Sequence, residues 1–287
     1  FNMMDQAEIL RQLASKSSGL NEKSKIITIT SGKGGVGKSN FVVNLAIALA
    51  KEGKKILLFD ADIGMGNDDV LMGIYHKYNI MDVINGEVSI ENGIIEGPHG
   101  IHLLPGGTGI NNIEDLTEEQ RERFISEIDR IDGYDYILID TGAGISRTVL
   151  AFIASSDEAI FILTPEPTSL TDGYSLFKAL KHFKIETHVN IVINRVISET
   201  EGKSTFNKFD LATRKFLNGY PSYLGCIYED KHITMAVRNQ IPIVIKYPKS
   251  EAAKSIVHVS EKIMGRESSI KGNGAKGLFN KLFDIFS

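Results

Sequence analysis

Residues 25–39 read Lys-Ile-Ile-Thr-Ile-Thr-Ser-Gly-Lys-Gly-Gly-Val-Gly-Lys-Ser, and this stretch decides the fold. Its first part, Lys25–Thr30, is typical of a buried strand, and Gly32–Ser39 satisfies the phosphate-loop pattern G-x-x-x-x-G-K-[ST]. In such a loop, glycines let successive backbone N–H groups turn toward one anion. Lys38 adds a charge at the β- and γ-phosphates, and Ser39 offers a hydroxyl to Mg²⁺. The stretch therefore predicts a strand, a loop and a helix that bind a nucleotide.

The same glycines fit a second motif. Residues 32–37 also satisfy the dinucleotide fingerprint G-x-G-x-x-G, and Asp60 ends the second predicted strand, where a ribose-binding acid would lie. This alternative predicts a nicotinamide enzyme. It leaves Lys33, Lys38 and Ser39 unexplained, because a pyrophosphate site of that kind needs only backbone donors. We therefore favour the phosphate loop.

Two further strands are predicted to end in acids. The apolar run Ile137–Ile139 leads into Asp140, which is placed like a Walker B carboxylate that orients Mg²⁺ through its water shell. Asp60 and Asp62 follow the strand Ile56–Phe59 with their side chains on one side of an extended chain, where they could hold a metal ion and a water. The alternative for this pair is a solvated loop with a turn-capping Asp. Because the chain also contains a phosphate loop, we favour the metal site over the solvated loop.

Short β-branched runs alternate with segments of helical spacing. This pattern predicts an α/β fold, a doubly wound, mostly parallel sheet with helices on both faces. The predicted strands are Lys25–Thr30, Lys55–Phe59, Ile101–Leu104, Tyr134–Ile139, Ala159–Leu163, Val189–Ile193 and Tyr223–Ile227, and the clearest helical segments are Asn40–Glu52, Glu118–Ile131 and Leu170–Phe183. We expect one domain at residues 24–265, a short amphipathic helix with a polar tether at 1–23, and a linker with an apolar tail at 266–287.

Composition narrows the class of protein. The 287 residues carry a net charge of −4, and 42% hydrophobic with 24% charged residues is ordinary globular usage, with no global reason to expect nucleic-acid binding. No run approaches 18 consecutive apolar residues, so we expect a cytoplasmic chain. The single cysteine, Cys226, excludes an internal disulfide and a Cys–Cys metal clamp.

Together these residues resemble the deviant Walker A family of ATPases, P-loop NTPases of the SIMIBI class that include the MinD, ParA and nitrogenase iron proteins. The resemblance covers residues 25–265, and its most specific mark is Lys33, which matches the family's signature lysine. It implies a homodimer that forms with ATP and Mg²⁺, in which this lysine reaches the partner's phosphates and Asp62 orients the attacking water. The implied residues are Lys33, Lys38 and Asp62 for catalysis, and Ser39, Asp60 and Asp140 for the metal.

The resemblance also implies where the nucleotide lies. Asn194-Arg195 matches the base-recognising position, and Ile227–Asp230 lies where a later loop packs on adenine, although Tyr228 stands where the family usually has proline. Pro165–Thr168 resembles the segment that lines the dimer face. The implied nucleotide-binding residues are Gly32, Lys33, Gly34, Gly35, Val36, Gly37, Lys38, Ser39, Asn194, Arg195, Ile227, Glu229 and Asp230.

Several branches of the family do not fit. Iron proteins and iron–sulfur carriers need more than one cysteine, and bacterial tyrosine kinases end in a tyrosine cluster that this tail lacks. DNA segregation requires a basic strip, whereas the run Lys203–Lys215 contains Asp210 and is better explained as a solvated helix face. We therefore expect no nucleic-acid partner. The MinD-like membrane branch remains.

The tail Lys276–Phe286 places apolar side chains at i, i+1, i+4, i+5, i+7 and i+8, with two lysines beside them. We interpret it as an interfacial helix that meets an anionic membrane in the ATP state, because a flexible linker precedes it. The alternative is a helix that docks on its own domain. The predicted membrane contacts are Leu278, Phe279, Leu282, Phe283 and Phe286.

Residues 5–11, Asp-Gln-Ala-Glu-Ile-Leu-Arg, match the Asp-Gln-Ala-x-x-Leu-Arg element of the FlhG group, also called FleN or YlxH. In that group the element stimulates the GTPase FlhF, so the resemblance implies a slow, partner- or membrane-stimulated ATPase that regulates flagellar placement and number, with C-ring proteins as further candidate partners. Two alternatives stay open: another MinD-like positioning ATPase, as for the cell-division site, and a non-catalytic adaptor. The implied FlhF contacts are Asp5, Gln6, Ala7, Leu10 and Arg11.

Overall fold

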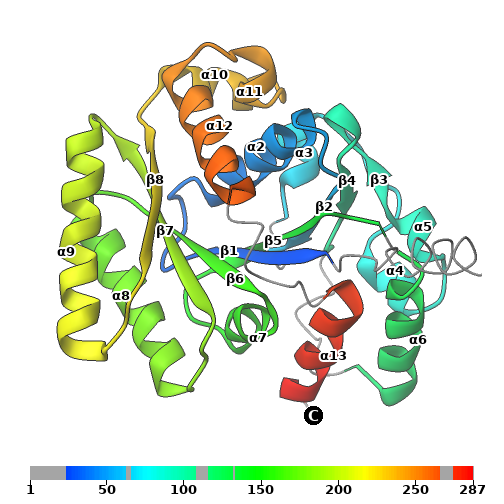
Figure 1. The fold of residues 1–287 in the computed structure, drawn as a ribbon. Coiled ribbons are helices and arrows are strands. Elements are labelled where there is room, and N and C mark those ends of the chain that lie inside the picture. The colour runs from blue at the N-terminus through cyan, green and yellow to red at the C-terminus, as the bar shows by residue number, and fades with distance from the viewer. Residues whose placement is uncertain (1–23, 63–65, 108–115, 132, 266–273, 287) are drawn as a thin grey trace, which may run out of the picture.

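The computed structural model describes residues 24–62, 66–107, 116–131, 133–265 and 274–286, so the predicted FlhF-binding element at residues 5–11 lies outside it. The described strands form one sheet in the order β3-β4-β2-β5-β1-β6-β7-β8 (Figure 1). Every neighbouring pair is parallel except β3 with β4. The strands are β1 (Lys25–Ser31), β2 (Ile56–Ala61), β3 (Ile95–Glu96), β4 (His102–Leu104), β5 (Tyr136–Ala143), β6 (Glu158–Leu163), β7 (His188–Val196) and β8 (Ser222–Tyr228). The predicted fold class and all seven predicted strands are confirmed.

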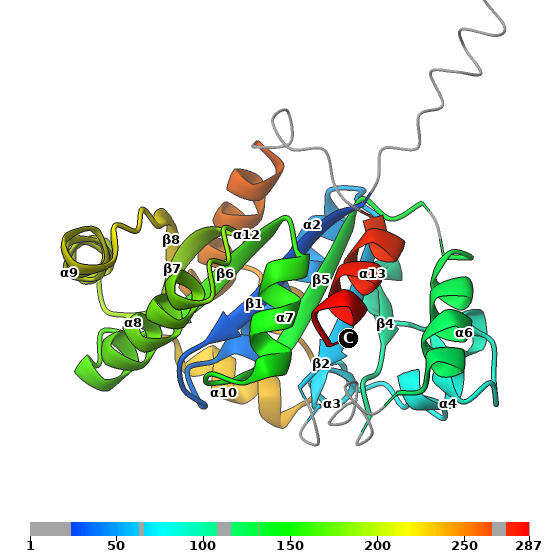
Figure 2. The same ribbon diagram turned by 90° about the horizontal axis from the view of Figure 1, so that it is seen from below.

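Helices cover both faces of this sheet. In Figures 1 and 2, α2, α10 and α12 lie on one face, and α7, α8 and α13 lie on the other. The described helices are α2 (Lys38–Lys51), α3 (Asp68–Met72), α4 (Ile80–Ile84), α5 (Ile90–Gly93), the 3₁₀ turn η1 (Pro98–Gly100), α6 (Glu118–Ile128), α7 (Arg147–Ser155), α8 (Pro167–His182), α9 (Glu199–Leu217), α10 (Lys231–Arg238), α11 (Ile243–Lys246), α12 (Glu251–Met264) and α13 (Gly274–Phe286). None of these helices is both long enough and apolar enough to cross a membrane.

The central strand β1 shows how the sheet separates two cores. Ile27 and Ile29 pack with α2 and α12, while Ile26 packs with α6 and α13 on the opposite face. Successive side chains of a strand point to opposite faces, so a strand covered on both sides is apolar at consecutive positions. This is why the run at residues 25–30 predicted a central strand.

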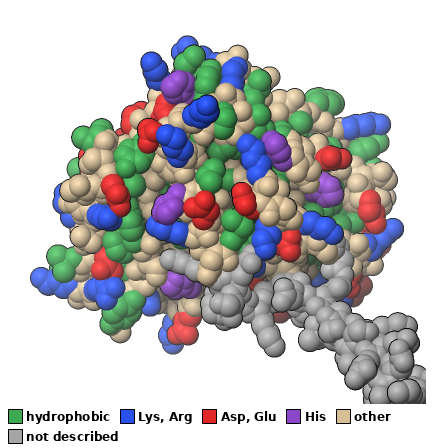
Figure 3. Space-filling view, turned by 45° about the horizontal axis from the view of Figure 1, so that its top comes forward, with side chains coloured by type: hydrophobic (Ala, Val, Ile, Leu, Met, Phe, Trp, Pro, Cys, Tyr) green, Lys and Arg blue, Asp and Glu red, His purple; other side chains and the backbone are tan. Residues whose placement is uncertain are grey.

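The cationic run Lys203–Lys215 lies within α9 and is held by local acids. Lys203 pairs with Glu199 at 2.7 Å, and Nε of Arg214 donates to both carboxylate oxygens of Asp210 at 2.7 Å. On the face drawn in Figure 3, basic and acidic side chains are likewise interspersed. The run therefore lies on a helix surface, as predicted, and two of its cations, Lys203 and Arg214, pair with acids of the same helix.

The C-terminal helix α13 packs against the domain. Leu278, Phe279, Leu282 and Phe283 are all buried, in the same cluster as Ile26. The ring of Phe279 lies 4.7 Å from that of Phe124 in α6 and 5.9 Å from that of Phe59 in β2, measured between centroids.

Polar contacts secure both ends of α13. Lys276 pairs with Asp129, and the guanidinium of Arg147 donates to the carbonyl oxygen of Ile285 at 3.2 Å. The alternative that the tail docks on its own domain is thus the arrangement seen in this structure. Membrane contact stays a prediction.

Candidate nucleotide-binding site

The phosphate loop lies at the carboxyl edge of the sheet, between β1 and α2. Val36 is buried, whereas Gly34 and Gly35 are exposed and leave their backbone open to a ligand. Ser39 is half-buried in the first turn of α2, directly after Lys38. A β-strand followed by a loop and a helix N-terminus is the arrangement that binds phosphate groups.

Two loop positions accept only glycine. A Cβ on Gly32 would lie 2.2 Å from the carbonyl carbon of Asp172 in α8, so the loop could not pass this helix with a larger residue. Gly37 has φ of +91°, a left-handed conformation that side chains disfavour, and its Cβ would lie 2.5 Å from Nδ2 of Asn194. The spacing of the motif is therefore set by packing as well as by phosphate chemistry.

The sheet register brings the predicted acids together. Asp60 of β2 pairs with Asp140 of β5, and in-register neighbours on adjacent strands point to the same face. That face is the one covered by α2, since Leu58 and Leu138, two residues earlier on each strand, pack against that helix. Asp60 and Asp140 consequently lie beside Lys38.

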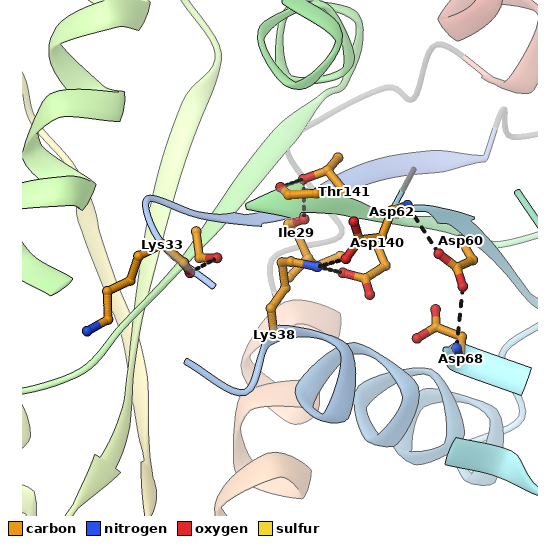
Figure 4. Close-up of polar contacts among 10 residues, drawn as sticks. Ile29, Lys33, Lys38, Asp60, Asp62, Asp68, Asp140 and Thr141 are labelled. Atoms are coloured by element: carbon orange, nitrogen blue, oxygen red, sulfur yellow. Dashed lines mark hydrogen bonds and ion pairs between the residues drawn. The ribbon is translucent and has the colours of Figure 1, made fainter. Parts of the chain in front are cut away.

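Lys38 is 6% exposed and is held by two of these acids (Figure 4). Its Nζ lies 2.6 Å from Oδ1 of Asp140 and 3.8 Å from Oδ2 of Asp62. Burial alone would lower the pKa of Lys38, but the ion pair with Asp140 outweighs it, so the pKa is raised and the amine keeps its charge. A charged amine at the head of the loop suits a phosphate ligand.

Asp60 and Asp62 are hard to ionise. Burial, with a contribution from Asp140, raises the pKa of Asp60 to about 7, although its oxygens accept the N–H groups of Asp62 and Asp68 at 3.1 and 3.3 Å. Burial likewise raises the pKa of Asp62, opposed by Lys38. A nearby cation would relieve this cost.

The residues present fit Mg²⁺. Ligand oxygens of Asp60, Asp68 and Asp140 lie within 4.8 Å of one another, and Oδ2 of Asp140 is buried without a hydrogen-bond partner. Carboxylate oxygens are the ligands that Mg²⁺ prefers. Asp68 was missed by the sequence analysis, where Asn67-Asp68-Asp69 gives no signal beyond acids at the start of a helix.

The predicted base-binding residues surround one pocket beside the loop. Asn194 and Arg195 lie near the end of β7 and also brace the loop, since Nδ2 of Asn194 donates to the carbonyl oxygen of Val36 and Arg195 donates to that of Gly35, both at 2.7 Å. The pocket is lined by Gly37, Asn40, Phe41, Asn194, Arg195, Ile227, Glu229, Asp230, Ile233, Thr234 and Ile256.

Tyr228, where the family usually has proline, does not line this pocket. It packs with the hydrophobic cluster on the opposite face of the sheet, with Val196 and Phe209. Asn40, Phe41, Ile233 and Thr234 are lining residues that no motif pointed to. They lie in α2 and α10, which reach the pocket only through the tertiary fold.

Lys33 points away from Lys38 (Figure 4). Its Nζ lies 2.6 Å from Oε2 of Glu166 and 3.0 Å from Oγ1 of Thr168, within the segment predicted to line a dimer face. The Lys33 side chain is 30% exposed and that of Glu166 is 53% exposed. Water screens such a pair, so Lys33 is only weakly restrained.

The chain is similar to a known protein family and to individual known proteins. A sequence model of an AAA domain matches residues 24–193. Antiactivator FleN of Pseudomonas aeruginosa is 34% identical over 249 residues, which cover 86% of this chain and 89% of FleN. The chain belongs to the MinD/ParA family of ATPases. The flagellum site-determining protein YlxH of Helicobacter pylori is 33% identical over 264 residues, 90% of this chain and 89% of YlxH.

A solved structure of the MinD/ParA family has the same fold. The septum site-determining protein MinD of Pyrococcus horikoshii, complexed with Mg-ADP, superposes with a TM-score of 0.69 at 27% identity, over 86% of this chain and 100% of MinD. Family membership makes this chain a nucleotide- and Mg²⁺-dependent ATPase. It sets aside both the nicotinamide enzyme and the non-catalytic adaptor.

Proposed function

We propose that this ATPase is an ATP-dependent, dimerising and membrane-associating switch that regulates flagellar placement and number together with the GTPase FlhF. The observation that carries the proposal is the similarity along most of the chain to FleN and to YlxH, a flagellum site-determining protein. Residues 5–11, which match the FlhF-stimulating element, add to it.

In this proposal each residue of the site has one task. The loop and Lys38 bind the phosphates of ATP, while Asn194, Arg195 and the loop Ile227–Asp230 hold its base. Ser39, Asp60 and Asp140 hold Mg²⁺, which supplies positive charge to the developing phosphoryl transition state. Asp62, beside Lys38 and half-buried, accepts a hydrogen bond from the attacking water and orients it.

Dimerisation is assigned to the face that contains Lys33. On ATP binding this lysine leaves Glu166 and Thr168 and reaches the phosphates of the partner. The pair it leaves is solvent-exposed, so breaking it costs little. Lys33→Ala is expected to abolish the ATP-dependent dimer in light scattering, whereas Glu166→Gln is expected to retain it. Loss of the dimer in both variants would contradict the assignment.

Membrane association requires α13 to leave the domain, because four of the side chains predicted to enter the membrane, those of Leu278, Phe279, Leu282 and Phe283, are buried in the cluster that contains Phe59 and Phe124. A single helix that exchanges one apolar environment for another gains little. Two helices on one ATP-bound dimer act at high effective concentration, which raises avidity by about 10² to 10⁴. The nucleotide that the protein holds then determines whether the protein binds the membrane.

Tethering α13 tests this step. In a Cys226→Ser background, Asp129→Cys and Lys276→Cys replace an ion pair between α13 and the residue that follows α6 with two thiols that a bismaleimide can bridge. The bridged protein is expected to lose liposome sedimentation in ATP while ATP-dependent dimerisation survives. The unbridged double variant is the matched control. Equal sedimentation of both forms would rule out undocking as the route to the membrane.

The FlhF assignment has a separate test. Deleting residues 1–20 removes the matching element and leaves every described residue in place. We expect ATP hydrolysis to persist while stimulation of FlhF GTPase activity disappears. If the truncated and full chains stimulate FlhF equally, or neither does, the second candidate gains: a MinD-like positioning ATPase, supported by the likeness to septum site-determining MinD.

A further inference from the structure

Three carboxylate oxygens beside the phosphate loop are buried with nothing to bind. They are Oδ1 and Oδ2 of Asp68, a residue with no exposed surface, and Oδ2 of Asp140. Buried polar atoms in folded proteins almost always have a hydrogen-bond partner, so each exception needs an explanation. Asp68 is the sharper case, because neither of its oxygens is satisfied.

The geometry of these side chains suits one ion. Asp60, Asp68 and Asp140 come from β2, α3 and β5, and each offers an oxygen within 4.8 Å of the other two. Figure 4 shows the three side chains grouped on the same side of the sheet as Lys38. Divalent cations bind carboxylate oxygens at about 2.0 to 2.6 Å, so two ligands of one ion lie no more than about 5 Å apart.

The charge of the cluster also indicates a site for a cation. In the described part of the chain, Lys38 is the cation in contact with it, and this one lysine faces Asp140 and Asp62 directly. Asp60 and Asp68 add two further carboxylates with no ion-pair partner among the described residues. Residues 63–65, which lie outside the described part of the chain, are Ile-Gly-Met and carry no charge. Burial raises the pKa of Asp60 and of Asp68, so these carboxyls take up protons readily in the metal-free protein, and a divalent ion that binds them displaces those protons.

We propose that Asp60, Asp68 and Asp140 bind one divalent cation when no nucleotide is present. Oxygen-only ligands select a hard ion, Mg²⁺, Mn²⁺ or Ca²⁺, over zinc or copper. Asp68 distinguishes this site from a metal held by nucleotide phosphates and Ser39. The bound ion ties the start of α3 to the two central strands. The inference goes beyond the proposed function and does not depend on it.

Mn²⁺ binding to the nucleotide-free full chain tests the proposal. Protein is treated with EDTA, checked by absorbance at 260 nm for residual nucleotide, and titrated with Mn²⁺ while electron paramagnetic resonance reports the free ion. We expect one tightly bound Mn²⁺ per chain. Asp68→Asn, which keeps the shape and removes the charge, is expected to weaken binding at least about tenfold.

Asp69→Asn is the matched control. Asp69 is the next residue of α3, but its carboxylate pairs with His76 at 2.8 Å and takes no part in the cluster. This variant is expected to bind Mn²⁺ like the unchanged chain. Thermal unfolding gives a second readout: at one Mn²⁺ concentration, close to the dissociation constant of the unchanged chain, Mn²⁺ should raise the midpoint of the unchanged chain and of Asp69→Asn by the same amount, and that of Asp68→Asn far less. A purely structural role of Asp68 would shift the midpoint in EDTA without removing the response to Mn²⁺.

Three results would each overturn the proposal: no Mn²⁺ binding by the nucleotide-free chain, undiminished binding by Asp68→Asn, or an equal loss in Asp69→Asn. The experiment contains no ATP, partner or membrane. Its failure therefore leaves the proposed function untouched.

Discussion

Lys38 is predicted to bind nucleotide phosphates, and in the free protein it neutralises Asp140. Removing one member of a buried ion pair strands the other and costs about 3 to 5 kcal/mol. Lys38→Ala is therefore expected to lose nucleotide binding and also to unfold at lower urea. Adding Asp140→Asn should restore much of the stability and none of the binding. Equilibrium unfolding and titration with a fluorescent ATP analogue separate the two effects, and a double variant as unstable as the single one would contradict the account.

At the same scale, sequence predicts some site residues better than others. The loop and Asp140 were predictable because each belongs to a short motif of consecutive residues. The loop has glycines followed by a lysine, and Asp140 is an acid directly after an apolar strand. Asp68 was not, because only the packing of α3 buries it. Nor did the motif indicate that Asn194 braces the loop, which depends on the strand order.

At the scale of elements, α13 offers an internally controlled measurement. Phe279 is 4% exposed against Phe124 and Phe59, whereas Ile285 on the same helix is 38% exposed. Phe279→Ala is expected to lower the free energy of unfolding by about 3 to 5 kcal/mol, and Ile285→Ala to change it by less than about 1 kcal/mol. Urea unfolding measures both. Similar small losses would show that the helix is not docked in solution.

A helix or strand was predictable where its own residues carry a clear hydrophobic pattern. Seven strands were found from apolar runs, but β3 has only two residues and joins the edge in antiparallel fashion, too little for a pattern. The tail was predicted as an amphipathic helix. Its partner could not be deduced, because a membrane and an exposed sheet face both accept the same apolar stripe.

At the scale of the whole molecule, one stretch of chain connects the candidate nucleotide-binding site with the C-terminal helix α13. β5 contributes Asp140 at the site and leads directly into α7, which packs against α13 and donates from Arg147 to Ile285. A chain that ends at residue 265 lacks α13 and would expose the surface around Phe59 and Phe124. We expect such a chain to aggregate or to unfold with reduced cooperativity in urea. A synthetic peptide of residues 272–287 added in trans should restore the sharp transition. A truncated chain that unfolds as sharply as the full one would show that the helix is dispensable to the core.

The docking of α13 also sets the timing of folding during synthesis. Side chains from β1, β2 and α6 complete their burial only against α13, which follows them in the chain. While a ribosome still holds that helix in its exit tunnel, the nascent domain presents an open apolar face to the cell. Chaperones that recognise such surfaces would meet this domain after β1, β2 and α6 have left the ribosome and before α13 has.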